Sequence, residues 1–124
     1  MAKLQASGMP DSFAENRRAQ IYKGVLDLAL LGLLKDGPEY GLQILDRLRA
    51  EAGLDLAAGS LYPLLHRLEA AGLVRATWRH ESAASHQRKY YSLTSTGRQD
   101  FEDHCTAWLT MSLRLNTFLR RKLR

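Results

Sequence analysis

The fold is decided by residues 60–79, SLYPLLHRLEAAGLVRATWR. Within residues 61–68, leucines recur at the i, i+3, i+4, i+7 spacing of an amphipathic helix. Ser60 stands directly before the first leucine, where serine is a typical N-cap. Gly72 ends the helix, and residues 73–79 then alternate between apolar and polar side chains, as in a half-buried β-strand. The stretch therefore predicts a helix that begins at Ser60 and leads directly into a strand.

The flanking residues add a second strand and two earlier helices. Residues 88–94, RKYYSLT, alternate in the same way, and the polar segment 80–87 is suited to a projecting loop between two antiparallel strands. Residues 15–35 carry apolar side chains around almost the whole helical circumference, so we expect this helix to be buried on several sides. Residues 40–52 predict a second, amphipathic helix after the Asp-Gly-Pro turn at 36–38.

The last helix, residues 95–124, is too long for the small body to cover, because about 26 helical residues span about 40 Å. Its apolar side chains could form a core stripe of the single chain, a dimer interface or the lining of an effector pocket. The length favours the dimer interface, with Trp108 and Met111 as candidates to line a pocket for a small effector. The stripe consists of Phe101, Cys105, Trp108, Met111, Leu115 and Phe118.

The order helix, helix, helix, strand, strand, helix predicts a mainly α fold with a small β-hairpin, namely a winged helix-turn-helix followed by a long C-terminal dimerisation helix. We expect a flexible N-terminal tail at residues 1–14, the DNA-binding domain at 15–94 and the dimerisation helix at 95–124. Trp78 and Tyr91 are expected in the core of the hairpin.

Side chains that suit DNA binding occupy the outer face of the third helix and the hairpin. The chain carries 18 Lys and Arg against 13 Asp and Glu, and its net charge of +5 favours a polyanionic partner. The helix N-terminus at Ser60 offers amides to a phosphate, and the other side chains contact bases or phosphates. The predicted DNA-binding residues are Ser60, Tyr62, His66, Arg67, Arg88 and Lys89.

Two longer motifs resemble the PadR family of transcriptional regulators. Residues 59–69, GSLYPLLHRLE, followed by Gly-Leu-Val at 72–74, are similar to the family signature around the recognition helix. Residues 89–94, KYYSLT, resemble its second wing strand. The resemblance implies a dimeric repressor that contacts its partner through the C-terminal helices and often loses DNA affinity when an effector binds. The single final helix looks like the smaller PadR subgroup.

The chain departs from the family pattern at two places. Tyr40 precedes Gly41, whereas the family usually has the reverse order at the start of the second helix. The wing tip, residues 82–85, lacks the Gly, Pro and Arg often found there, so we expect the wing to contact phosphates only.

Other classes of protein find little support in the sequence. Cys105 is the only cysteine, so an intrachain disulfide is excluded, and with no signal-peptide core and no membrane-length apolar run we expect a cytoplasmic protein. His104 and Cys105 are neighbours on a helix and point about 100° apart, which does not suit a catalytic pair. His80 and His86 lack metal-ligand spacing, so we expect no metal, no cofactor and no enzyme activity.

Three hypotheses therefore remain, in decreasing order of support. The first is a homodimeric repressor that binds a pseudo-palindromic operator in double-stranded DNA and is released by a small hydrophobic or aromatic effector. The second is a winged-helix protein-interaction module that never binds DNA, and salt-dependent DNA binding would exclude it. The third is an enzyme, which would need a converging polar cleft.

Overall fold

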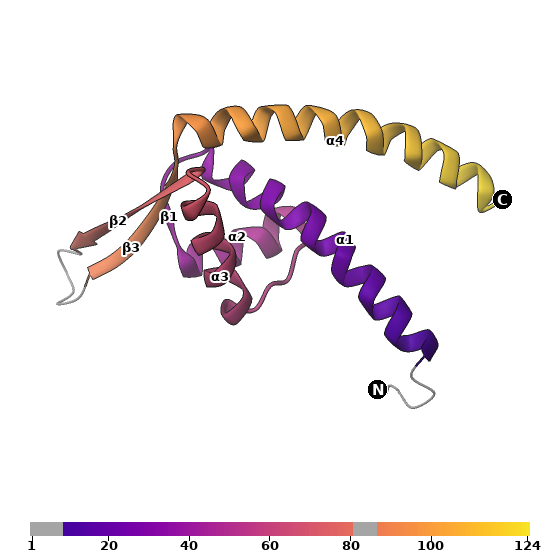
Figure 1. Ribbon diagram of the computed structural model, residues 1–124, viewed down its shortest axis with the longest axis horizontal. Coiled ribbons are helices and arrows are strands. Elements are labelled where there is room, and N and C mark those ends of the chain that lie inside the picture. Colours follow the sequence, from indigo (N-terminus) through magenta and orange to yellow (C-terminus); the bar gives the residue numbers. More distant parts are fainter. Residues whose placement is uncertain (1–8, 81–86) are drawn as a thin grey trace.

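The computed structural model describes residues 9–80 and 87–124 of the chain (Figure 1). Its elements, in chain order, are α1 (Met9–Leu34), β1 (Glu39–Tyr40), α2 (Gly41–Ala52), α3 (Ala58–Ala70), β2 (Val74–His80), β3 (Gln87–Leu93) and α4 (Ser95–Lys122). The strands form one antiparallel sheet in the order β1-β3-β2. This is a mainly helical winged helix-turn-helix, as the sequence predicts, with α2 and α3 as the helix pair and β2–β3 as the wing.

The leucine-rich half of α1 lies at the centre of the core. Leu30, Leu31 and Leu34 are at most 2% exposed, because α2, β3 and α4 each contact this helix. A helix surrounded in this way needs apolar side chains on several sides, which accounts for its sequence. The rest of the core comes from Ile44 and Leu48 of α2, Leu61, Leu64, Leu65 and Leu68 of α3, and Val74 and Tyr91 of the hairpin.

The start of α4 is fixed against the turn between α3 and β2. The Thr94 hydroxyl donates to the Gly72 carbonyl at 2.6 Å and accepts from the Gly97 amide at 2.9 Å, which caps the helix. Gly97 is buried, and a Cβ at this position would overlap the backbone carbonyl of Leu73. From this anchor α4 runs away from the body, and α1 and α4 diverge toward the two chain ends (Figure 1).

Helix α1 begins earlier than expected. The sequence predicts that ordered structure starts near Glu15, after a flexible tail at residues 1–14, but α1 begins at Met9. Residues 11–14 contain neither glycine nor proline, so nothing in them stops the helix before Glu15. Residues 1–8 lie outside the described part of the chain.

Helix α3 also begins earlier than expected, so the prediction that Ser60 is its N-cap is wrong. Ala57 is the N-cap, and its carbonyl accepts from the amides of Ser60 at 2.9 Å and Leu61 at 3.2 Å. Residue 58 is alanine, the residue type with the highest helix propensity, and Gly59 in the first turn does not interrupt the helix. The first turn therefore begins two residues before Ser60.

The prediction that Trp78 belongs to the hairpin core is wrong, whereas Tyr91 is buried there. Trp78 pairs with Lys89 and is 61% exposed, while Tyr91 pairs with Ala76 and is 4% exposed. Alternation places Trp78 and Tyr91 on the same face of the hairpin. The outer end of the hairpin projects beyond the helices, so only the inner half of that face is covered (Figure 1).

Candidate nucleic-acid interface

The outer face of α3 is exposed because the buried leucines occupy the other side of the helix. His66 lies near the middle of the exposed face, opposite the leucines in helical spacing. Tyr62 lies at the edge that meets the hairpin, and Ser60 and Arg67 lie at the edge that meets α1. The predicted DNA-binding residues of this helix therefore fall on three adjoining strips of one exposed surface.

Tyr62 lies in a groove where α3, the start of α2 and the hairpin meet. The Tyr62 hydroxyl contacts Gly41 so closely that a Cβ at Gly41 would overlap it. The ring nevertheless stays 49% exposed, so part of it is accessible to a partner. We call this the hairpin groove; it measures about 550 Å³ and is lined by Tyr40, Gly41, Leu42, Tyr62, Trp78, Arg88, Lys89 and Tyr91.

Arg88 and Lys89 point to opposite faces of the hairpin, because successive strand side chains alternate. The Lys89 ammonium lies 5.7 Å from the ring centre of Trp78, on the face that carries the hairpin groove. The Arg88 guanidinium stacks over Tyr40 at 4.3 Å, and the rings of Tyr40 and Tyr90 meet edge to face at 5.4 Å. Cation–π contacts of this kind orient a cation without neutralising its charge. Both cations therefore remain able to attract phosphate, but from different sides of the wing.

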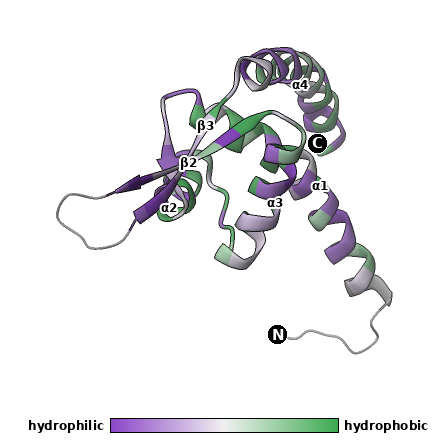
Figure 2. Cartoon of the chain, turned by 60° about the vertical axis from the view of Figure 1, so that its left-hand side comes forward, coloured by the Kyte–Doolittle hydropathy of each residue, from purple (hydrophilic) through white to green (hydrophobic). Residues whose placement is uncertain are grey.

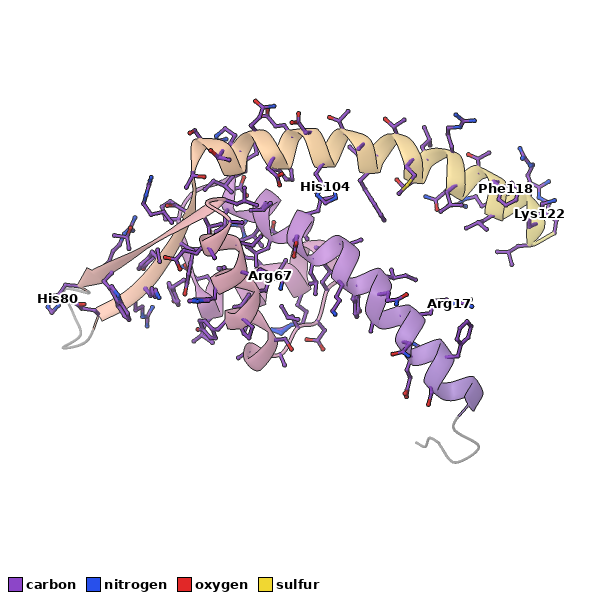
Figure 3. The ribbon with its side chains drawn as sticks, viewed as in Figure 1. Arg17, Arg67, His80, His104, Phe118 and Lys122 are labelled. Atoms are coloured by element: carbon purple, nitrogen blue, oxygen red, sulfur yellow. The ribbon has the colours of Figure 1, made fainter. Side chains whose placement is uncertain are left out.

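Ser60 and Arg67 face α1 across a second groove. The Arg67 guanidinium donates to the Asp27 carboxylate at 3.1 Å, and the Arg67 side chain is 64% exposed (Figure 3). An exposed pair of this kind contributes at most about 1 kcal/mol to stability, yet it orients Arg67 toward α1. The Ser60 amide already donates within the first turn, so it is not one of the free amides expected to hold a phosphate.

Sequence reasoning missed an ion-pair cluster that positions the hairpin groove. Arg47 of α2 donates to Glu39 at 2.7 Å, to Asp36 at 2.6 Å and to Glu51 at 2.7 Å. The hydrogen bonds with Glu51 and then Asp36 raise the pKa of Arg47, and the bond to Arg47 lowers the pKa of Glu51. By holding Glu39, the cluster fixes β1 and with it Tyr40 at the groove. The sequence signals only part of this cluster, through the i,i+4 spacing of Arg47 and Glu51.

Leu42 adds an exposed apolar side chain to the hairpin groove. It is 63% exposed in the first turn of α2 and lines the hairpin groove beside Trp78. Two large apolar side chains that remain exposed next to cationic ones give the groove a mixed character. This suits a partner with both charged and apolar surface, such as the phosphates and sugars of a nucleic-acid backbone.

The residues predicted to form a dimer interface are partly buried near the start of α4 and exposed farther along the helix. Phe101 packs against Gly32 of α1, where its ring would lie 2.8 Å from an added Cβ. Cys105 and Trp108 are half-buried, and the side chains farther along α4 are largely exposed. Met111, Leu115 and Phe118 are 54%, 48% and 45% exposed, respectively. Hydrophobic segments thus recur along α4 well beyond the core (Figure 2).

Neither a metal centre nor a membrane helix is present in the described residues. Within residues 9–80 and 87–124, no three His, Cys, Asp or Glu side chains are grouped to hold a metal ion. Among these same residues, no helix is both long and apolar enough to cross a membrane. The predicted phosphate-only wing tip at 82–85, together with His86, lies outside the described residues.

Comparison with known proteins assigns this architecture. The model of the PadR-like family of transcriptional regulators matches residues 30–103, which span α2, α3, the hairpin and the start of α4. The chain belongs to the PadR-like family. It is therefore a DNA-binding transcriptional regulator and not an enzyme.

Solved PadR-like structures share its fold, and two of them are matched over nearly their whole length. A PadR-like regulator from Bacillus cereus is 30% identical, with a TM-score of 0.73 over 81% of this chain and 96% of that chain. A PadR family regulator from Eggerthella lenta is 28% identical, with a TM-score of 0.72 over 88% and 94%. PadR of Bacillus subtilis, solved in complex with operator DNA, is 30% identical, with a TM-score of 0.58 over 64% of this chain and 45% of that chain. An uncharacterised protein of Lysinibacillus sphaericus is 26% identical over 104 residues, which are 82% of this PadR-like chain and 94% of that protein.

Proposed function

We propose that this PadR-like regulator is a cytoplasmic repressor that binds a pseudo-palindromic operator in double-stranded DNA as a homodimer. The observation that carries the proposal is the exposed outer face of α3 lying next to a groove that combines Tyr62, Trp78 and Lys89. The complex of the similar Bacillus subtilis PadR with operator DNA supports the same kind of partner here.

Each predicted contact residue has a role that follows from its place. His66, in the middle of the exposed face, and Tyr62, at its edge, would hydrogen-bond base edges in the major groove. Lys89 and Arg88 both line the hairpin groove, from opposite faces of the wing strand, and would contact phosphates there. Arg67 and Ser60 would contact the backbone along the α1 edge.

The dimer would form through the exposed apolar side chains of α4. Leu115 and Phe118 lie where α4 has left the protomer body, and burying them requires a second copy of the helix. Ile21 in the projecting half of α1 is 59% exposed and would add to the same interface. A two-fold axis there would set two α3 helices about 34 Å apart, in successive major grooves.

Release from DNA would follow from effector binding between the paired α4 helices. Trp108 and Met111 offer an aromatic and a flexible apolar wall there, which suits a small hydrophobic or aromatic molecule. The effector would act by binding more tightly to a dimer whose α3 helices are wrongly spaced.

DNA binding at two salt concentrations tests the DNA-binding part of the proposal. The dimer should bind duplex DNA with an affinity that falls steeply as salt rises. Lys89→Ala should weaken binding to all sequences alike and reduce the salt slope by about one, whereas Tyr62→Ala and His66→Ala should weaken operator binding specifically. Lys122→Ala, at the far end of α4 (Figure 3), is the matched control and should leave the slope unchanged. No affinity at low salt would favour a protein-interaction module instead.

Sedimentation velocity tests the dimer. Leu115→Glu places a charge in the proposed interface and should give monomers. Thr110→Glu adds the same charge to the opposite side of α4 and should leave the dimer intact. If both variants remain dimeric, the α4 interface is wrong.

A further inference from the structure

The start of α2 lies beside the outer face of α3. A Cβ at Gly41, the first residue of α2, would overlap the Tyr62 hydroxyl of α3. Leu42 follows directly in the chain, and it lines the hairpin groove together with Tyr62 and with Lys89 of the wing. DNA that is bound by Tyr62 and Lys89 would therefore also lie within reach of Leu42.

Leu42 takes no part in the described core. Its side chain is 63% exposed, and it is not among the apolar residues that pack against the core. The other large apolar side chains of α2, those of Ile44, Leu45 and Leu48, all contribute to that packing. A single exposed leucine needs no explanation in general. This one, however, lies in the groove that the proposed function assigns to DNA.

The charges around Leu42 favour DNA as the occupant of the groove. Arg88 and Lys89 both line it, and no acidic residue of the described chain does so. The Lys89 ammonium lies 5.7 Å from the ring centre of Trp78, a contact that leaves its charge available to a phosphate. A strand whose phosphates lie at these two cations would have its base edges close to Tyr62 and Leu42.

The apolar group that base pairs present in the major groove is the C5 methyl group of thymine. The remaining groups are hydrogen-bond donors and acceptors, with which an aliphatic side chain cannot pair. We propose that Leu42 recognises the methyl group of one thymine in each half of the operator and so helps to determine the sequence that is bound. This inference rests on the proposed function and adds a specificity-determining residue to it.

The place of Leu42 predicts which base pair carries this thymine. Tyr62 lies at the edge of α3 that meets the hairpin, and Leu42 lies in the groove beyond that edge. The thymine should therefore be next to the base pair that Tyr62 contacts, on the side away from His66. Burial of one methyl group against an apolar side chain corresponds to about a fourfold change in affinity, so two half-sites together should contribute about ten- to twentyfold.

Paired selections from a random-sequence duplex library, with wild type and with Leu42→Ala, locate the position. Wild type should enrich a thymine in each half-site that Leu42→Ala does not enrich, and the other preferences should stay the same. Circular dichroism should show an intact fold, because Leu42 is exposed and alanine is a strong helix former. Leu123→Ala shortens a leucine that is 87% exposed at the end of α4 and, as the matched control, should select the wild-type sequence. Identical selections by wild type and Leu42→Ala would overturn the proposal.

Deoxyuridine then tests the methyl group alone, since it differs from thymidine only in lacking that group. With deoxyuridine at the selected position of both half-sites, wild type should lose about ten- to twentyfold in affinity, measured by fluorescence anisotropy. Leu42→Ala should bind the two duplexes with nearly equal affinity. At the same position, cytosine that carries a C5 methyl group should bind wild type more tightly than unmodified cytosine. A deoxyuridine penalty that persists undiminished in Leu42→Ala would mean that another side chain contacts the methyl group.

The same measurements separate the role of Leu42 from the proposed function. If wild type selects an operator whose affinity depends on no thymine methyl group, the role of Leu42 is refuted and operator binding stands. If wild type selects no sequence and binds no duplex at low salt, the proposed function is refuted, and the role of Leu42 with it.

Discussion

Replacing Gly41 with alanine separates the positioning of Tyr62 from the stability of the fold. The added Cβ would overlap the Tyr62 hydroxyl and lie 2.9 Å from its Cζ atom, so the end of the ring must move by about 1 Å to restore ordinary contact. A shift of that size is enough to break one hydrogen bond to DNA. We expect operator affinity to fall about five- to thirtyfold, which corresponds to about 1–2 kcal/mol.

The fold itself should tolerate the change. Tyr62 is 49% exposed and can swing outward, and alanine favours a helix over glycine by up to about 1 kcal/mol. The free energy of unfolding should therefore not fall. Gly24→Ala, where an added Cβ meets nothing within 4 Å, is the matched control and should leave DNA affinity unchanged.

A double-mutant cycle, measured by fluorescence anisotropy on a labelled operator, decides whether Gly41 acts through Tyr62. In a Tyr62→Ala background the Gly41→Ala change should have no further effect on affinity, because the clash has been removed. An undiminished effect in that background would show that Gly41 acts some other way and would refute the reasoning. Full affinity of Gly41→Ala alone would show that the position of Tyr62 does not matter.

Two further substitutions test the contacts around α3. Gly97→Ala places a Cβ on a backbone carbonyl that cannot move aside, so we expect a loss of about 1–3 kcal/mol in the free energy of unfolding, measured by urea denaturation; an unchanged midpoint would contradict the close contact. Asp27→Asn removes the carboxylate partner of Arg67, so affinity for DNA of any sequence should rise about two- to fivefold at low salt, while the melting temperature changes little because the pair is exposed. Weaker DNA binding by Asp27→Asn would mean that the ion pair holds α3 in its binding position.

The spacing of apolar residues predicts the helices and strands because it shows which side of each element is buried. It says less about the residues at which each element begins and ends. The leucines of α3 predict a helix but not the residue at which it begins. Ala58 and Gly59 can belong to the helix, and Ser60 can equally well be its N-cap, so the sequence allows both starts. The strand Glu39–Tyr40 is only two residues long and has no period of its own, so it becomes visible only when paired with β3. For Trp78, the alternation of apolar and polar residues predicts the face of the hairpin on which the side chain lies. It does not predict whether another element covers that face.

The candidate site depends on contacts between residues far apart in the sequence. Arg67 is identifiable as an exposed cation, but its partner Asp27 lies 40 residues earlier on another helix. The overlap of Gly41 with Tyr62 likewise joins the first turn of α2 to the second turn of α3. Composition and local pattern therefore identify the side chains that could bind a partner. Packing decides which of them already contact other residues of the chain.

Helix α1 connects the recognition helix with the proposed dimerisation helix. One side of α1 holds Arg67 of the recognition helix through Asp27, and another receives Phe101 of α4 at Gly32. The recognition helix and the proposed dimerisation helix are thus both attached to α1. An effector between the paired α4 helices that moves α4 relative to α1 would therefore also move α3. The spacing of the two α3 helices then becomes less well defined, and DNA affinity depends on that spacing.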